Sequence, residues 1–219
     1  MAQAANQIFL FDVDNTLIDN DHVQADMGAH LAEFHGEAVR DRYWAIFEEI
    51  RSELGYADYL GALERYRLEA MHDPTILRMA NWLVDYPFPD RLYPNAIETV
   101  RQIGGKGPTV ILSDGDAVFQ PRKIWRSGLW AAFEERVLIY VHKEQMLDDV
   151  ERLYPAAHYV MIDDKLRILT AMKHIWGDRL TTVFVRQGHY ATDKVALSTF
   201  PAADVAIDAI ADLRHCDFG

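Results

Sequence analysis

Short apolar runs separated by helical patterns constrain the fold of this chain more than any other feature of its sequence. The runs are rich in valine, isoleucine, leucine and aromatic residues and lack a polar alternation, as is typical of strands that are covered on both faces. They are Ile8–Val13, Thr109–Leu112, Val137–Val141, Tyr159–Ile162 and Thr181–Val185. Because helical patterns lie between the runs from residue 95 onward, the sequence predicts βαβ units and a parallel sheet.

The stretch from residue 21 to residue 92 has a different character. It contains no strand-like run, and its apolar residues recur at helical spacing, as in Trp44, Phe47 and Ile50. It ends in a proline-rich segment, 86–94, of the kind that forms a linker or a helix start. The sequence therefore predicts a helical insertion that separates the first strand from the rest of an α/β core.

Polar and charged residues follow four of the predicted strands. The carboxyl ends of parallel strands meet at one edge of a sheet, where ligands bind. Asp12 and Asp14 lie at the end of the first run, Ser113 follows the second, Lys143 the third, and Asp163 and Asp164 the fourth. Asp12 and Asp14 would repel each other at this edge unless a cation lay between them, and a hard cation such as Mg²⁺ prefers oxygen ligands of this kind.

These residues resemble the four motifs of the haloacid dehalogenase superfamily. The Asp-x-Asp-x-Thr motif is matched by Asp12, Asp14 and Thr16, although Asn15 stands where the family often has glycine. An apolar strand that ends in serine or threonine is matched by Ser113, a lysine that opens a helix by Lys143, and an acidic pair by Asp163 and Asp164.

The resemblance implies a fold and a division into domains. The expected fold class is α/β, with a Rossmann-like parallel-sheet core of this superfamily and an inserted α-helical cap of the type 1 kind. The core would comprise residues 1–20 and 93–219, and the cap residues 21–92. Such caps close over the site and exclude water before the reaction.

The resemblance also implies catalytic roles. Asp12 would be the nucleophile that attacks phosphorus, and Asp14 the acid that protonates the leaving alcohol and then activates water. Ser113 would bind the phosphate, and Lys143 would neutralise it and hold Asp12. Because Glu144 replaces the proline that often follows the motif lysine, Lys123 and Lys165 remain alternatives to Lys143.

Metal and substrate ligands follow from the same motifs. Mg²⁺ would be held by Asp12, by the main-chain carbonyl of Asp14 and by Asp164, with Asp163 binding directly or through water. Four further residues are assigned to substrate binding, although Asp114 also suits a helix cap and Gly115 a plain turn: Asn15, Thr16, Asp114 and Gly115.

Among the activities of the superfamily, phosphomonoester hydrolysis fits best. Dehalogenases generally lack the second acid of the first motif, whereas Asp14 is present here. The phosphonate-cleaving branch needs a lysine in the cap, and the first lysine of this chain is Lys106. A phosphomutase would need a cap that binds a second phosphate, for which the cap offers Arg40, Arg42, Arg65 and Arg67. A non-catalytic phosphoryl-binding regulator is the other alternative.

The amino-acid composition limits the classes of partner that the chain is expected to bind and the compartment in which it is expected to work. Lysine and arginine number 22 against 34 acidic residues, so the formal charge of −12 argues against nucleic acid and against an anionic membrane surface. The single cysteine, Cys216, cannot close an intrachain disulfide, which favours a reducing compartment. With no run long enough to span a membrane and no signal-peptide pattern, we expect a cytoplasmic enzyme that acts on a small phosphorylated substrate. The sequence leaves its oligomeric state open.

Overall fold

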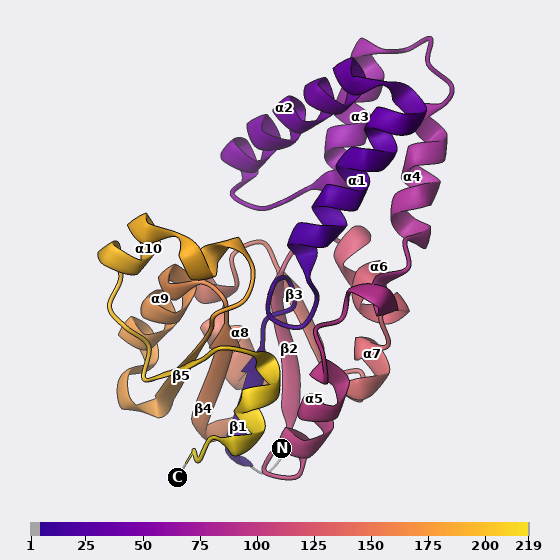
Figure 1. Cartoon of the computed structure of the whole chain (residues 1–219). Helices are drawn as coiled ribbons and strands as arrows, with labels where there is room; N and C mark the ends of the chain where they lie inside the picture. Colours follow the sequence, from indigo (N-terminus) through magenta and orange to yellow (C-terminus); the bar gives the residue numbers. More distant parts are fainter. Residues whose placement is uncertain (1–4, 219) are drawn as a thin grey trace.

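The predicted parallel sheet is present in the computed structural model of the chain, which describes residues 5–218 (Figure 1). All neighbouring strands pair in parallel, in the order β3-β2-β1-β4-β5-β6. The strands are β1 (Ala5–Phe11), β2 (Thr109–Asp114), β3 (Val137–Tyr140), β4 (Ala156–Asp163), β5 (Leu180–Val185) and β6 (Val205–Ile207). The α/β fold class is therefore confirmed.

Helices cover both faces of this sheet. Along β1, Ile8 and Leu10 pack on the face that carries α8 and α9, whereas Phe9 and Phe11 pack on the face that carries α5, α6 and α7. The side chains alternate in this way because successive residues of a strand point to opposite faces. The helices are α5 (Ala96–Gly104), α6 (Phe119–Arg126), α7 (Leu129–Ala132), α8 (Leu147–Leu153), α9 (Leu166–Trp176) and α10 (Lys194–Thr199).

Four helices follow β1 and stand above the sheet in Figure 1: α1 (Asn20–His35), α2 (Glu37–Leu54), α3 (Tyr59–Glu69) and α4 (Ile76–Asp85). Asp19 and Asp58 cap the first turns of α1 and α3 with their side chains. Helix α2 ends at Gly55 in the left-handed conformation, which glycine adopts without strain. We call α1–α4 the inserted helices.

Their bounds agree with the predicted helical insertion, and the division into two domains at residues 20 and 92 stays our proposal. The core range proposed from the sequence, 1–20 and 93–219, includes residues 1–4 and 219, which lie outside the described residues. Within the described part of the chain, no helix is both long enough and apolar enough to cross a membrane.

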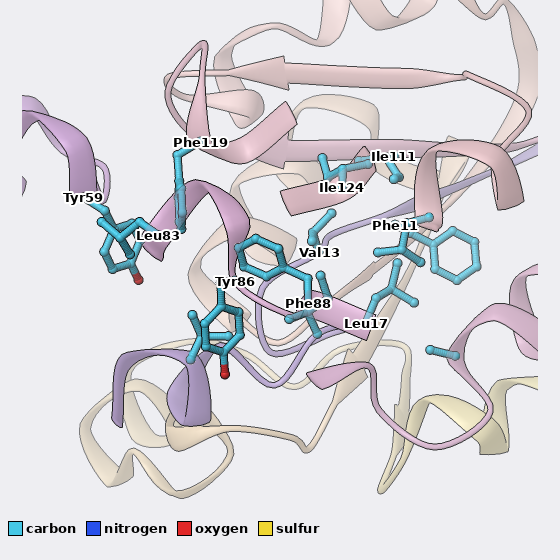
Figure 2. Packing of buried hydrophobic residues seen from close by; sticks show 14 of the residues in the cluster. Phe11, Val13, Leu17, Tyr59, Leu83, Tyr86, Phe88, Ile111, Phe119 and Ile124 are labelled. Atoms are coloured by element: carbon cyan, nitrogen blue, oxygen red, sulfur yellow. The ribbon is translucent and has the colours of Figure 1, made fainter. Parts of the chain in front are cut away.

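The hydrophobic core of the sheet continues into the inserted helices (Figure 2). Phe11 at the end of β1 packs in the same cluster as Phe88, and the ring of Phe88 lies 5.8 Å from that of Phe119. Phe119 in turn contacts Tyr59 at the start of α3, with 5.1 Å between the ring centroids. This aromatic contact connects the core helix α6 directly to the inserted helices.

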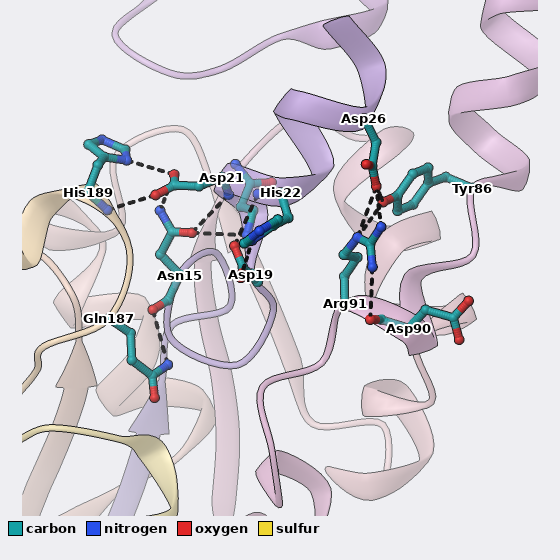
Figure 3. Close-up of polar contacts among 11 residues, drawn as sticks. Asn15, Asp19, Asp21, His22, Asp26, Tyr86, Asp90, Arg91, Gln187 and His189 are labelled. Atoms are coloured by element: carbon teal, nitrogen blue, oxygen red, sulfur yellow. Dashed lines mark hydrogen bonds and ion pairs between the residues drawn. The ribbon is translucent and has the colours of Figure 1, made fainter. Parts of the chain in front are cut away.

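A polar cluster secures the return of the chain from the inserted helices to the sheet (Figure 3). Arg91 lies at the end of the proline-rich segment, in a 3₁₀ turn spanning Phe88–Arg91. Its Nε donates to Oδ2 of Asp26 in α1 at 3.0 Å, and the hydroxyl of Tyr86 donates to the same oxygen. The predicted linker is thus tied to α1 by a charged hydrogen bond.

Replacing Asp26 with asparagine should remove a pH-dependent part of the stability. Partial burial raises the pKa of Asp26, but hydrogen bonds from Tyr86 and Arg91 outweigh it and hold the pKa below its ordinary 3.8. A carboxyl group of this kind contributes stability above its unfolded pKa and loses that contribution as the pH falls through the folded pKa. Urea unfolding of the wild type and Asp26→Asn should therefore differ by about 1 kcal/mol at neutral pH and converge in acid. A difference that persists undiminished in acid would contradict the assignment.

Candidate active site

A cleft of about 1060 Å³ lies between the inserted helices and the carboxyl edge of the sheet. Four of the residues assigned to the site from the sequence line it, Asp14, Asn15, Asp114 and Asp164, and so does Lys165, one of the alternatives to Lys143. The inserted helices contribute lining residues that include Gln24, Arg51 and Tyr56. This volume suits a small molecule.

Asp12 and Lys143 form a buried ion pair at this edge. Asp12 follows β1 and Lys143 follows β3, and their side chains are 4% and 2% exposed. The Nζ of Lys143 lies 2.6 Å from Oδ1 of Asp12 and 2.7 Å from Oδ2 of Asp163. Burial lowers the pKa of Lys143, but the charges of Asp12 and Asp163 outweigh it and raise that pKa above its ordinary value. Of the three candidate lysines, Lys143 is thus the one in contact with Asp12.

The acidic pair after β4 has an excess of negative charge that suits a cation. Oxygen atoms of Asp12, Asp163 and Asp164 lie within 4.8 Å of one another, and all three residues are buried. Asp163 is occupied by Lys143 and by the main-chain N–H of Lys165, whereas neither carboxylate oxygen of Asp164 has a hydrogen-bond partner. Burial raises the pKa of Asp164, and the nearby charge of Lys165 offsets this only in part. A divalent cation that prefers oxygen ligands would bind the carboxylate oxygens that lack a hydrogen-bond partner.

The second acid of the first motif has a lysine of its own. Oδ1 of Asp14 accepts a hydrogen bond from the Nζ of Lys123 at 2.6 Å, and Oδ2 lies 3.4 Å from the Nε2 of Gln120. Gln120 also donates to Oγ of Ser113 at 3.0 Å. Each acid of the first motif thus contacts a lysine of its own, Lys143 for Asp12 and Lys123 for Asp14. The metal ion expected from the sequence at this edge stays a prediction.

Asn15 and Thr16 form the turn after β1 (Figure 3). Asn15 has a positive φ of 60°, and its side chain is engaged with the start of α1, because its amide donates to Asp21 and its carbonyl accepts from the main chain of Asn20. Thr16 is fully buried and does not line the cleft. Both residues shape the loop that presents Asp12 and Asp14, and contact with substrate stays a prediction for each.

The segment after β2 is held by local contacts. Oδ1 of Asp114 accepts the main-chain N–H of Lys143 at 2.7 Å, which fixes the loop that carries this lysine. A side chain at Gly115 would collide with Gln120, since a Cβ there would lie 2.6 Å from its side-chain atoms. Asp116 accepts the main-chain N–H groups of Val118 and Phe119, where α6 begins. Gly115 thus permits the close approach of Gln120 to the site.

Sequence reasoning missed two contacts between the inserted helices and the core. Arg51 of α2 donates to the hydroxyl of Tyr190 at 3.0 Å, and both residues line the cleft. Gly55 lies so close to His142 that a Cβ would approach its ring to 2.6 Å. No local sequence pattern predicts these contacts, because the residues that form them lie far apart in the sequence.

The four arginines considered for a second phosphate site point elsewhere. Each is within ion-pair distance of a carboxylate, and none of the four is among the described residues that line the cleft. The pairs are Arg40 with Asp41, Arg42 with Glu49 and Glu69, Arg65 with Glu53, and Arg67 with Glu64. These arginines therefore form ion pairs on the surface of the inserted helices.

Addition of Mg²⁺ should stabilise the folded protein through Asp164. Ligand that binds only the folded state adds about 2.7 kcal/mol to the free energy of unfolding at one hundred times its dissociation constant. Urea unfolding with Mg²⁺ and with EDTA measures this increase. Asp164→Asn should abolish it, whereas the exposed-site control Asp148→Asn should retain it. An unchanged increase in Asp164→Asn would place the ion elsewhere.

The chain is similar in sequence and structure to known proteins. A family model for haloacid dehalogenase-like hydrolases matches residues 7–175. Among curated proteins, none matches the sequence. A crystal structure of a protein from Burkholderia xenovorans LB400, assigned to the haloacid dehalogenase-like hydrolases, is 62% identical with a TM-score of 0.94. The match covers 97% of this chain and 99% of that chain.

More distant structures share the fold. The L-2-haloacid dehalogenase of Xanthobacter autotrophicus is 19% identical, with a TM-score of 0.61 and coverage of 96% of this chain and 97% of that chain. The hydrolase YfnB of Bacillus subtilis, crystallised with bound magnesium, is 17% identical, with a TM-score of 0.61 and coverage of 96% and 98%. At this level of identity, the similarity concerns the fold alone.

Proposed function

Because this chain belongs to the haloacid dehalogenase-like hydrolases, we propose that it is a Mg²⁺-dependent phosphomonoester hydrolase that acts on a small phosphorylated metabolite through an aspartyl-phosphate at Asp12. The observation that carries the proposal is the excess of buried carboxylate around Asp12, where neither oxygen of Asp164 has a hydrogen-bond partner. A phosphate ester brings further negative charge to this site, so a cation is needed there. Displacement of a halide from a haloacid does not require a cation at this place.

The donor set suits Mg²⁺, and a hydrolase of the same fold from Bacillus subtilis was crystallised with magnesium. Asp12 and Asp164 would hold the ion, with Asp163 and the main-chain carbonyl of Asp14 beside them. When bound, Mg²⁺ would supply positive charge that offsets the repulsion between the phosphate and the nucleophile.

In the first step, a carboxylate oxygen of Asp12 would attack phosphorus and form the new P–O bond. The ester P–O bond breaks, its electron pair goes to the alcohol oxygen, and Asp14 gives that oxygen a proton. Lys143 holds Oδ1 of Asp12 at 2.6 Å, which limits rotation of the nucleophile. In the second step, Asp14 would take a proton from water as the water attacks phosphorus, and phosphate and free Asp12 are released.

The position of Asp14 favours phosphate ester hydrolysis over dehalogenation. Its side chain lines the cleft and is 24% exposed, so it can reach a leaving group there. A halide leaves without a proton, so an acid at this place would serve no purpose in a dehalogenase. General acid catalysis of alcohol departure is worth about 10²- to 10⁴-fold in rate.

Phosphate release from p-nitrophenyl phosphate, with Mg²⁺ and with EDTA, tests the proposal. We expect turnover that requires the metal, and no chloride release from 2-chloropropionate under the same conditions. Chloride release without phosphatase activity would instead support a dehalogenase. A phosphomutase would isomerise a sugar phosphate faster than it releases phosphate, and a regulatory protein would bind phosphate without turnover.

A further inference from the structure

Lys123 is a buried cation that the reaction described above does not use. Its side chain is fully buried on α6, and its Nζ donates to Oδ1 of Asp14 at 2.6 Å and to Oδ1 of Asn20 at 3.0 Å. The rings of Tyr59 and Phe119 lie within 5.8 Å and 5.3 Å of the same nitrogen. An ammonium group is costly to bury, so these contacts must compensate for the water that it loses.

The contacts of Lys123 join three parts of the fold. Asp14 belongs to the loop after β1, and Asn20 is the first residue of α1. Asn20 donates through Nδ2 to the hydroxyl of Tyr59, the first residue of α3, at 3.1 Å, and Gln24 donates to the same hydroxyl at 2.8 Å. A continuous chain of hydrogen bonds thus runs from the carboxylate in the cleft, through Lys123, to the inserted helices.

We propose that Lys123 is a positioning residue, whose ammonium fixes the carboxylate of Asp14 in the cleft and, through Asn20 and Tyr59, ties its position to that of the inserted helices. The inference rests on the proposed function, because it assigns Asp14 the task of protonating a leaving group. Lys123 donates to Oδ1 of Asp14, so the proton that Asp14 gives to the leaving group would be held on Oδ2, which has Gln120 3.4 Å away.

The geometry explains why a lysine, rather than an apolar residue, stands at this place. A carboxylate on a loop can take several rotamers, and one hydrogen bond to a fixed partner selects among them. Helix α6 provides that fixed partner, because Asp116 accepts the main-chain N–H of Phe119, its first residue, and Phe119 packs in the core. A shift of the inserted helices would move Tyr59 and Asn20 and so disturb the group that holds Asp14.

Leaving groups of different acidity test the proposal. Nitrophenolate departs with little help from an acid, whereas an alkoxide needs a proton. Lys123→Met should therefore lower kcat/KM for glycerol 2-phosphate by about 100-fold and for p-nitrophenyl phosphate by less than about 5-fold. The control Lys194→Met removes an exposed lysine and should change neither value. Equal losses on the two substrates would overturn the proposal, because a general structural defect would produce them.

A double-mutant cycle separates action through Asp14 from action on the whole site. If Lys123 works through Asp14, Lys123→Met should cost less than about 2-fold in kcat/KM once Asp14→Asn is present. Fully additive losses would contradict the proposal. Tyr59→Phe keeps the ring and removes only the hydroxyl. It should also lower kcat/KM more for glycerol 2-phosphate than for p-nitrophenyl phosphate, by about one tenth of the factor expected for Lys123→Met. Tyr66→Phe on the same helix should show no such difference between the substrates.

Hydrogen exchange gives a readout that does not depend on turnover. Lys123→Met and Tyr59→Phe should both speed amide exchange in residues 14–20 relative to their control variants, since this segment carries Asp14 and Asn20. Unchanged exchange in both variants would contradict the proposal even in an active enzyme. If exchange were faster in these variants but the protein hydrolysed no phosphate ester, the role of Lys123 in positioning Asp14 would stand, and the proposed function would be refuted.

Discussion

Asp12→Asn should lower kcat/KM for p-nitrophenyl phosphate by at least about 10⁴-fold, because an amide cannot attack phosphorus and removal of a nucleophile has losses of this order or larger. The same variant should stay folded. Asp12 is one of three buried acids around Lys143, and its loss relieves repulsion while Asp163 still pairs with the lysine. Phosphate release and urea unfolding measure the two effects separately.

A matched control distinguishes this result from a loss of overall charge. Asp148→Asn makes the same chemical change at an exposed position of α8 and should keep wild-type activity. If Asp12→Asn retained more than about one hundredth of the wild-type rate, another nucleophile would have to carry the reaction.

Lys143→Met should have the largest effect on stability. The ammonium group lies between the carboxylates of Asp12 and Asp163, and all three side chains are buried. Removing one partner of a buried pair leaves uncompensated charge, which costs about 3–5 kcal/mol. We expect this loss in urea unfolding with EDTA, and a partial recovery when Mg²⁺ is added, because the ion would neutralise the same carboxylates.

The contrast with Asp12→Asn makes this prediction specific. Both variants remove one charge from the same cluster, but only Lys143→Met removes a cation, the one that contacts Asp12 and Asp163 directly, and leaves Lys165 as the remaining positive charge nearby. Lys194→Met provides the surface control and should leave the unfolding free energy within about 0.5 kcal/mol of the wild type. A Lys143→Met protein as stable as the wild type in EDTA would mean that the cluster carries less negative charge than described.

The sheet could be predicted from the sequence because burial on both faces leaves continuous apolar runs. The strand ends were less accurate, since hydrophobicity reports burial rather than pairing. Val13 is fully buried, yet β1 ends at Phe11, and β4 begins at Ala156, before the apolar part of its sequence. His158 belongs to that strand although it is polar, because it pairs with Gln7 of β1, and its ring hydrogen-bonds to Thr181 on β5.

The residues around Asp12 could be identified for a related reason. Parallel strands bring their carboxyl ends together, so acids and a lysine directly after strands must lie close to one another, whatever the loops between them do. Asp12 and Lys143 are 131 residues apart in the chain and share a hydrogen bond. The strand pattern therefore contained enough information to place them at one edge.

The surroundings of Asp14 could not be predicted in this way. Lys123 lies within a helix among arginines and a tryptophan, and the sequence offered it only as an alternative to Lys143. Its burial follows from the packing of α6 against the inserted helices, through the contact of Phe119 with Tyr59. Such contacts depend on how two helices meet in space, which no local pattern specifies.

Trapping the phosphorylated enzyme tests the central claim most directly. Asp14→Asn should still be phosphorylated by p-nitrophenyl phosphate, whose leaving group needs little acid, while the missing base slows water attack. We predict that an acid quench of this variant with Mg²⁺ retains one phosphoryl group, and that peptide mass spectrometry places it on Asp12. Turnover of the ester with no phosphoryl group on the protein, or with the group on another residue, would contradict the account.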